Sequence, residues 1–132
     1  GNTDVLVDKK ATFKEIDIFG IDYQRAESAY KRAMGTLDIN TERFSLLLYH
    51  EPKFVEYSAR KGFDLMLYGH THAGQIWPFT WVVDWMYTYS DGLFSVPDTD
   101  TMVYVSDGVA LWGPRMRVGS QNEMTLFYIQ AE

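Results

Sequence analysis

The sequence predicts an α/β fold in which a mixed β-sheet carries its helices on one face. Two short apolar runs, at 44–49 and 64–68, have the length of buried strands. Between them, apolar residues at helical spacing follow Pro52, and Gly62 ends the segment. A strand–helix–strand unit of this kind makes two parallel strands joined by a right-handed crossover. This unit therefore forms the centre of the predicted sheet.

The first third of the chain predicts strands followed by a helix. Residues 4–8 and 11–20 alternate apolar and polar positions, which is typical of strands, and Asp8-Lys9-Lys10 is expected to turn between them. From Ala26 onward, apolar residues recur at i, i+3, i+4, i+7 and i+8. This spacing indicates a helix over 23–34, which Gly35 closes.

The second half of the chain is less regular. Residues 73–100 are rich in aromatic residues, glycine and proline, and they predict a long loop with one short helix near 80–87. Two further strands are expected at 102–106 and 124–130, joined by a turn-rich link that contains Gly113-Pro114.

Length and composition limit the classes of function. The 132 residues suit a single domain, 1–132, and 46% apolar with 16% aromatic residues allow a sizeable core. A net charge of −6 argues against a nucleic-acid-binding surface. It does not exclude a small anionic substrate, because bound divalent cations reverse the local sign of charge. The absence of cysteine excludes disulfides and thiolate metal ligands.

All three histidines of the chain lie where predicted strands end. His50 closes the first buried strand, and His70 and His72 follow the second within Gly69-His70-Thr71-His72. Ligand sites in open α/β sheets collect at such strand ends, and imidazole is a common ligand of transition metals. A single histidine of this kind is more often a hydrogen-bonded strand-end residue, but three together favour metal binding.

Five segments of the chain carry a resemblance to a known family. They are Gly20-Ile21-Asp22, Leu47-Leu48-Tyr49-His50-Glu51-Pro52, Gly69-His70-Thr71-His72-Ala73-Gly74-Gln75-Ile76, Tyr104-Val105-Ser106-Asp107-Gly108 and Pro114-Arg115-Met116-Arg117-Val118-Gly119. In their order and spacing they resemble the calcineurin-like metallophosphoesterases, whose last motif is Gly-His-x-His. The Gly-Gln pair after that motif is similar to one bacterial branch of the family.

The resemblance implies the C-terminal half of an αββα sandwich and the metal-dependent hydrolysis of phosphoester bonds. It implies that His50 and His70 bind one ion of a dinuclear centre and that His72 binds the other. The two divalent cations, manganese, iron or zinc, would hold phosphate oxygens and generate a bridging hydroxide nucleophile. The branch also implies a bacterial protein, cytoplasmic or membrane-associated, with a lipid- or nucleotide-linked phosphoester as substrate.

The resemblance further implies motifs that this sequence lacks. Asp-x-His, Gly-Asp and Gly-Asn-His supply a bridging carboxylate, an asparagine ligand and a histidine that assists the leaving group, and none of them occurs here. Gly1-Asn2-Thr3-Asp4 imitates the third motif, but it lies too close to the segment at Gly20. We therefore expect a truncated domain that is inactive alone, with its catalytic residues unassigned, and an enzyme as the parent protein. A non-catalytic metal- or membrane-binding module is the alternative.

The aromatic segment at 77–87 has two interpretations. Its side chains either pack into the core or contact a membrane or a lipid-like substrate. No Lys or Arg occurs from Gly62 through Pro114, whereas six Asp do, which argues against docking on anionic lipid. Insertion of apolar side chains into a bilayer stays open. A homodimer is expected where an apolar sheet face is left uncovered.

Arg115 and Arg117 flank Met116 after a Gly-Pro turn. An arginine near the metal edge can grip a substrate phosphate through two hydrogen bonds, so both are candidate substrate-binding residues. The alternative is a structural pair on a solvated strand face or beside Asp107 or Glu123.

Overall fold

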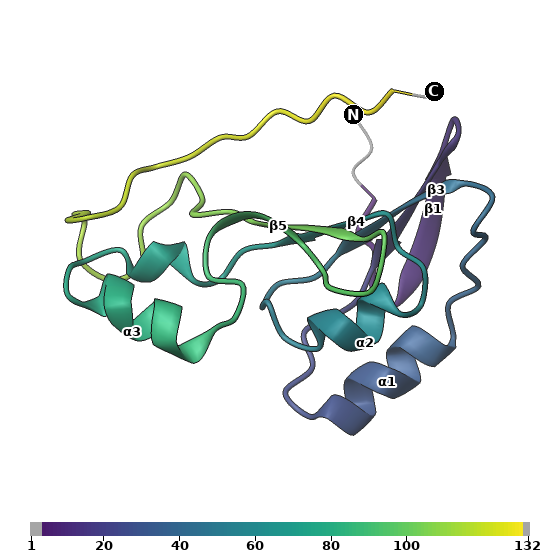
Figure 1. The fold of residues 1–132 in the computed structure, drawn as a ribbon, viewed down its shortest axis with the longest axis horizontal. Helices are drawn as coiled ribbons and strands as arrows, with labels where there is room; N and C mark the ends of the chain where they lie inside the picture. The colour runs from purple at the N-terminus through teal and green to yellow at the C-terminus, as the bar shows by residue number, and fades with distance from the viewer. Residues whose placement is uncertain (1–3, 131–132) are drawn as a thin grey trace.

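The computed structural model describes residues 4–130 and contains one six-stranded sheet (Figure 1). The strands are β1 (Lys9–Phe13), β2 (Ile16–Gly20), β3 (Phe44–Leu48), β4 (Leu65–Tyr68), β5 (Gly92–Ser95) and β6 (Met102–Val105). Their order is β1-β2-β3-β4-β6-β5. The four central strands are parallel, and β1 and β5 pair antiparallel at the two edges. The predicted α/β fold with a mixed sheet is confirmed.

Three helices and one short 3-10 turn complete the described structure. They are α1 (Glu27–Gly35), α2 (Val55–Ala59), α3 (Phe79–Met86) and η1 (His72–Gly74). Figure 1 shows α1 and α2 side by side beneath the sheet, with α3 at the end of the molecule far from β1. The hydroxyls of Tyr30 and Ser58, 2.6 Å apart, join α1 to α2. Within residues 4–130, no helix has the length and apolar character needed to cross a membrane.

A row of four apolar side chains fixes the register of the parallel strands. Phe19 pairs with Leu47, Leu47 with Met66, and Met66 with Val103, and all four side chains are fully buried. Phe19 also meets Phe63 edge to face, with ring centroids 5.3 Å apart. Each such side chain contributes about 1.5–3 kcal/mol by its burial. A slip of one residue would turn the row to the other face, so burial specifies this pairing.

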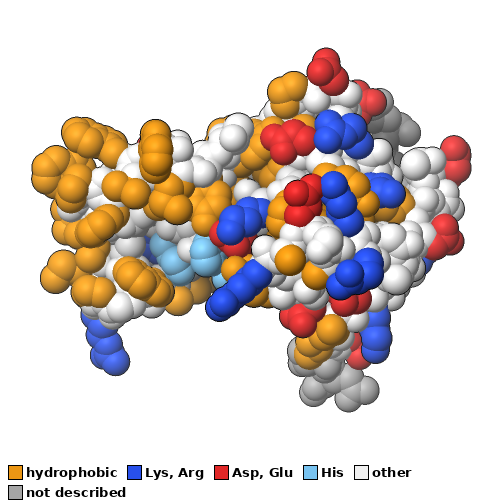
Figure 2. All heavy atoms as spheres, turned by 90° about the horizontal axis from the view of Figure 1, so that it is seen from below, with side chains coloured by type: hydrophobic (Ala, Val, Ile, Leu, Met, Phe, Trp, Pro, Cys, Tyr) orange, Lys and Arg blue, Asp and Glu red, His pale blue; other side chains and the backbone are white. Residues whose placement is uncertain are grey.

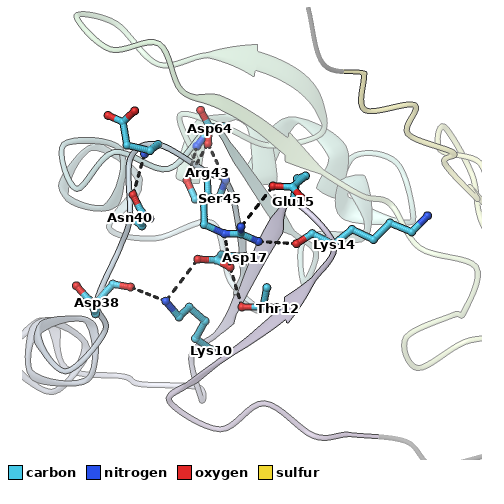
Figure 3. Close-up of polar contacts among 11 residues, drawn as sticks. Lys10, Thr12, Lys14, Glu15, Asp17, Asp38, Asn40, Arg43, Ser45 and Asp64 are labelled. Atoms are coloured by element: carbon cyan, nitrogen blue, oxygen red, sulfur yellow. Dashed lines mark hydrogen bonds and ion pairs between the residues drawn. The ribbon is translucent and has the colours of Figure 1, made fainter.

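A buried carboxylate ties the β1–β2 hairpin to the beginning of β3. Asp17 is 2% exposed and accepts hydrogen bonds from the Thr12 hydroxyl at 2.8 Å and from Nε of Arg43 at 3.1 Å. Lys10 adds an ion pair at 3.4 Å (Figure 3). Arg43 also donates to the carbonyl of Lys14, in the hairpin turn, at 2.6 Å. The charge of Asp17 is therefore paired on both sides, as a buried charge requires.

The predictions for the N-terminal strands were wrong in detail. Residues 4–8 form no strand, and the predicted strand at 11–20 is divided between β1 and β2 by a hairpin turn at Lys14-Glu15. Lys14 adopts a left-handed φ of 53°, so the chain reverses there without a glycine. Asp8 bends the chain before β1, with φ 49°, but it does not make the hairpin turn. Gly1-Asn2-Thr3 lie outside the described residues.

The two helices predicted in the first half of the chain, at 23–34 and after Pro52, both exist, but they begin later than expected. α1 starts at Glu27 rather than at 23, because the Tyr49 hydroxyl bonds both the amide and the carbonyl of Gln24 and holds that residue out of the helix. Pro52 does not lie in the first turn of α2, since Phe54 before the helix has a left-handed φ of 59°.

Two predictions for the last third also changed. The short helix expected near 80–87 is α3, but residues 92–95, expected as loop, form β5 against β6. The strand expected at 124–130 is absent from the sheet. That segment runs as an extended chain above it in Figure 1. Its attachment is through side chains, because the Tyr104 hydroxyl bonds the Glu123 carboxylate and the Tyr104 ring meets Phe127 edge to face.

Candidate metal centre

The parallel pairing of β3 and β4 brings two histidines into contact. Leu48 pairs with Leu67, and the amide of Gly69 donates to the carbonyl of His50 at 3.1 Å, which extends the pairing past the strand ends. Nδ1 of His70 then lies 2.9 Å from Nε2 of His50, and the two rings meet edge to face. The predicted convergence of His50 and His70 at one edge of the sheet is therefore present.

The chain after β4 is held in an unusual conformation. His70, His72, Ala73 and Gln75 all have positive φ, at 75°, 49°, 46° and 52°. Each such residue costs on the order of 1–3 kcal/mol, and strain of this kind clusters at functional sites. Thr71 supports the turn, because its hydroxyl donates to the carbonyl of Ser90 at 2.8 Å.

His72 is oriented by a backbone carbonyl. Its Nδ1 donates to the carbonyl of Asp107, just beyond β6, at 3.2 Å. A proton on Nδ1 leaves Nε2 with a free lone pair. Histidines that bind metals commonly anchor the second ring nitrogen in this way, which sets the tautomer.

The His50–His70 pair fits a single cation. With metal–nitrogen distances of about 2.0–2.1 Å, two ligand nitrogens at right angles lie about 2.9 Å apart. This matches the observed separation of 2.9 Å, which is also an ordinary hydrogen-bond length between two imidazoles; the tetrahedral angle typical of zinc would place the nitrogens about 3.3 Å apart. Burial lowers the pKa of His70, which favours the neutral, ligating imidazole. Among residues 4–130, however, no group of three or more His, Asp or Glu side chains is arranged to hold a metal ion. The described residues could thus supply only part of a coordination shell.

Glu51 is a buried carboxylate beside the histidine pair. It is 3% exposed and accepts hydrogen bonds from Nζ of Lys53 and the Tyr87 hydroxyl, both at 2.7 Å, and from the Tyr23 hydroxyl at 3.1 Å. Its Oε1 lies 3.9 Å from Nε2 of His70. Burial alone would raise the pKa of Glu51, but the hydrogen bonds from Lys53 and Tyr87 outweigh it and lower the pKa. Glu51, which follows β3, therefore contacts both Tyr87 at the end of α3 and His70 through its carboxylate.

The structure separates the two candidate arginines. Arg117 donates to the carbonyls of His72, at 3.1 Å, and of Asp107, at 2.7 Å, so its guanidinium faces the protein interior. Arg115 is exposed and makes none of these contacts, although both arginines line an open hollow of about 430 Å³ with Leu111 and Asn122. The role of either side chain toward a phosphate stays a prediction.

Asp107 is a polar group that sequence reasoning did not assign to the site. One of its carboxylate oxygens, Oδ1, is buried and has no hydrogen-bond partner among residues 4–130. Burial, with the charges of Asp91 and Glu123, raises its pKa to about 6. Neither Asp107 nor Glu51 carried a signal beyond its place next to a motif, because their contacts come from segments far away in the sequence.

The 77–87 segment does not pack into the core. None of the side chains of α3 is buried. We call the exposed apolar side chains around it the aromatic surface. Its members are Trp77, Phe79, Trp81, Trp85, Met86 and Trp112, all more than half exposed. Figure 2 shows hydrophobic side chains over this end of the molecule, charged side chains gathered over the opposite end, and histidine at the boundary. The sheet edge that carries the histidines therefore opens beside an apolar surface.

Comparisons with known proteins find relatives whose names describe metallophosphoesterases. The chain is 34% identical, over 99% of its length, to an uncharacterized metallophosphoesterase of Campylobacter jejuni. It is 42% identical over 66% of its length to a transmembrane protein with metallophosphoesterase domain of Bos taurus. An uncharacterized metallophosphoesterase of Helicobacter pylori is 40% identical over 64% of the chain.

These matches cover only part of each relative. The chain spans 36% of the Campylobacter jejuni protein, 20% of the Bos taurus protein and 23% of the Helicobacter pylori protein. No family model matches the chain, and no solved structure matches it significantly.

Proposed function

Because this chain belongs to the calcineurin-like metallophosphoesterase family, we propose that the whole protein hydrolyses phosphoester bonds with the help of two divalent cations. The observation that carries the proposal is the His50–His70 pair, whose ring nitrogens lie 2.9 Å apart at the ends of two parallel strands. His50 and His70 would hold one cation, and His72, whose Nε2 keeps a free lone pair, would hold the other. When bound, the two cations position phosphate oxygens and supply a hydroxide nucleophile.

The side chains of this chain contribute orientation rather than the whole reaction. The Asp107 carbonyl selects the tautomer of His72, and Glu51 places a negative charge 3.9 Å from Nε2 of His70. A negative charge beside an imidazole raises the basicity of its ring. Two cations held by imidazoles alone would repel one another, because no bridging carboxylate offsets their charge. The 132-residue chain by itself is therefore expected to be inactive.

Metal content and hydrolysis test this proposal together. The 132-residue chain and a longer form that carries the Asp-x-His and Gly-Asn-His motifs are supplied with manganese and assayed with a phosphomonoester and a phosphodiester. We expect two cations and turnover in the longer form only, both lost in His50→Ala. Turnover by the 132-residue chain that depends on its histidines would refute its expected inactivity. A longer form that binds no metal and hydrolyses neither ester would overturn the enzymatic proposal.

A second role is supported by the aromatic surface, for which we propose contact with the interface of a zwitterionic bilayer. Trp81 is 66% exposed and Trp85 is 86% exposed, and tryptophan partitions to the headgroup region of membranes. No Lys or Arg occurs from 62 to 114 and the net charge is −6, so anionic lipid offers no attraction. Because the surface adjoins the histidines, a lipid-linked phosphoester is the substrate class that fits it.

Flotation with phosphatidylcholine vesicles tests the membrane contact. The chain is expected to float with the vesicles, and Trp81→Ser with Trp85→Ser is expected to abolish this. Met124→Ser, which removes an apolar side chain that is 89% exposed on another segment, is the control. Flotation of the double variant would contradict the proposed contact of the aromatic surface with the bilayer. Self-association lost in the same variant, without flotation in the original chain, would instead assign the surface to a homodimer.

A further inference from the structure

Both Nη nitrogens of Arg117 are bonded to the chain around His72. Its Nη atoms donate to the carbonyls of His72 at 3.1 Å, Asp107 at 2.7 Å, Gly108 at 3.2 Å and Ala110 at 3.1 Å, and to the Ser120 hydroxyl at 3.2 Å. A guanidinium carries four N–H donors on these two nitrogens, and five acceptors share them. The remaining nitrogen, Nε, is buried and has no hydrogen-bond partner among residues 4–130. All four Nη donors are therefore engaged with the protein, and the fifth donor, on Nε, is buried.

Two of these carbonyls act on the same imidazole. One belongs to His72 itself, and the other, of Asp107, also accepts the proton on Nδ1 of His72. Arg117 thus holds the backbone of His72 and the acceptor that orients its ring with a single planar group. We propose that Arg117 is the positioning residue of His72, which fixes the ring in the Nδ1–H tautomer and leaves Nε2 directed to a cation.

The neighbouring contacts explain why the tie is needed. His72 has a φ of 49°, which an unsupported residue would leave. Gln75, which is 2% exposed, donates from Nε2 to the carbonyl of Trp112 at 2.6 Å and accepts from the Trp112 amide at 2.6 Å. Val118 extends this junction, since its amide donates to the carbonyl of Gln75 at 2.9 Å. Hydrogen bonds therefore join the histidine turn to the chain after β6, and those of Arg117 add the connection at His72.

The chemistry of arginine suits this role better than that of lysine. A guanidinium is planar and donates in a fixed fork, so it can reach carbonyls of two chain segments at once. An ammonium group keeps the positive charge and has three donors, but they share one nitrogen and have no fixed planar fork, so it does not reproduce the geometry that spans the two carbonyls. Arg117→Lys therefore separates the geometry of the fork from its charge. Arg115 offers the matched control, because it is exposed and lies two residues away.

The inference rests on the proposed function only for the identity of the ligand, a divalent cation. The tautomer itself can be measured in the metal-free chain by nitrogen NMR of the imidazole rings. We expect His72 to carry its proton on Nδ1 in the original chain and in Arg115→Ala. In Arg117→Ala and Arg117→Lys, Nε2–H signals of His72 should appear while His50 and His70 stay unchanged.

A titration of the longer form, which carries the Asp-x-His and Gly-Asn-His motifs, with zinc alone supplies the second readout. Loss of an orienting contact typically lowers metal affinity by about 10- to 100-fold. We expect a loss of this size for the cation at His72 in both Arg117 variants and none in Arg115→Ala. If Arg117→Ala does not fold, Arg117→Lys decides the question by the same two readouts.

Three results would overturn the inference. They are an unchanged His72 tautomer in the Arg117 variants, full zinc affinity in Arg117→Lys, and an equal change at all three histidines. Failure of the proposed function looks different. In that case the longer form binds no zinc, yet the tautomer of His72 still depends on Arg117, and the positioning role stands.

Discussion

Nδ1 of His70 lies 2.9 Å from Nε2 of His50, although 20 residues separate them in the sequence. The contact follows from the parallel register of β3 and β4, in which Leu48 pairs with Leu67. Two imidazole nitrogens at this distance share either a proton or a cation. Burial lowers the pKa of His70, which favours the neutral imidazole, the form in which it would bind a cation.

The first prediction concerns which histidines share a cation. His50→Ala and His70→Ala should each weaken zinc binding at the same ion, so the double substitution should cost no more than the larger single loss. Each loss of zinc affinity should be at least about 10- to 100-fold, the range typical of losing a group that only orients a metal ligand. Calorimetric titration of the two single variants and the double variant measures the coupling.

His72→Ala provides the contrast within the same experiment. If His72 belongs to another ion, its loss should add to that of His50→Ala rather than overlap with it. Overlap between His72 and His50 would contradict the assignment of these two histidines to separate cations.

The second prediction concerns Glu51, which is 3% exposed and bonded by Lys53, Tyr87 and Tyr23. Glu51→Gln keeps the shape but removes the charge that these donors share, and it should lower the free energy of unfolding by about 1.5–3 kcal/mol. Tyr87→Phe removes one of the hydrogen bonds and should cost about 1 kcal/mol. Urea unfolding measures both.

Tyr128→Phe is the control for these substitutions, because Tyr128 is 82% exposed and should change stability by less than about 0.5 kcal/mol. A Glu51→Gln variant as stable as this control would show that the buried network contributes nothing. The position of the histidine pair would then depend on strand pairing alone.

The centre of the fold was predictable because its signals are local. The apolar runs at 44–49 and 64–68, with a histidine just after each, are sufficient to place His50 and His70 at one edge of a parallel pair. The hairpin at 9–20 was missed because its turn at Lys14-Glu15 contains none of the usual turn residues. The strand predicted at 124–130 fails for another reason. Alternation of apolar residues does not by itself supply a pairing partner.

The supporting groups of the site could not be predicted from the sequence. Arg117 reaches His72 across 45 positions, and Tyr87 reaches Glu51 across 36. Such contacts depend on how loops return over the strand ends, and no short-range pattern encodes them. The sequence did identify Arg117 as a candidate, but for a phosphate rather than for backbone carbonyls.

The third prediction concerns the dependence of stability on pH. The hydrogen bond from Thr12, followed by those from Arg43 and Lys10, lowers the pKa of Asp17 against the burial that would raise it. A carboxylate whose pKa is lower in the folded state stabilises above its unfolded pKa, about 3.9. This contribution is lost as the pH falls from about 4 through the folded pKa.

Asp17→Asn tests this contribution directly. At neutral pH this substitution should lower the free energy of unfolding by about 1.5–3 kcal/mol, because the hydrogen bonds to the charged carboxylate are lost. Below about pH 4 the difference from the original chain should shrink. Glu15→Gln is the control, because Glu15 is 93% exposed and its 3.5 Å contact with Arg43 is a surface pair (Figure 3). A difference that is independent of pH would contradict the assignment.

The last prediction concerns Gly74, which sets the approach of α3 to the histidine turn. Gly74 has a φ of 71°, and an added Cβ would lie 2.5 Å from the carbonyl carbon of Phe79 and from the amide nitrogen of Thr80. The neighbours are backbone atoms at the beginning of α3, so they can move only if the helix shifts. Gly74→Ala should lower the free energy of unfolding for two reasons. A left-handed alanine costs about 1–2 kcal/mol, and overpacking against these atoms costs about 1–3 kcal/mol.

Gly35→Ala separates this steric effect from the general effect of removing a glycine. Nothing lies within 4 Å of a Cβ added at Gly35, the last residue of α1, and the substitution should stabilise the chain by about 0.5–1 kcal/mol. Thermal unfolding should therefore move in opposite directions for the two variants, and tryptophan fluorescence should change only in Gly74→Ala. If both variants gain stability equally, α3 is free to move away from the turn, and the aromatic surface has no fixed place beside the histidines.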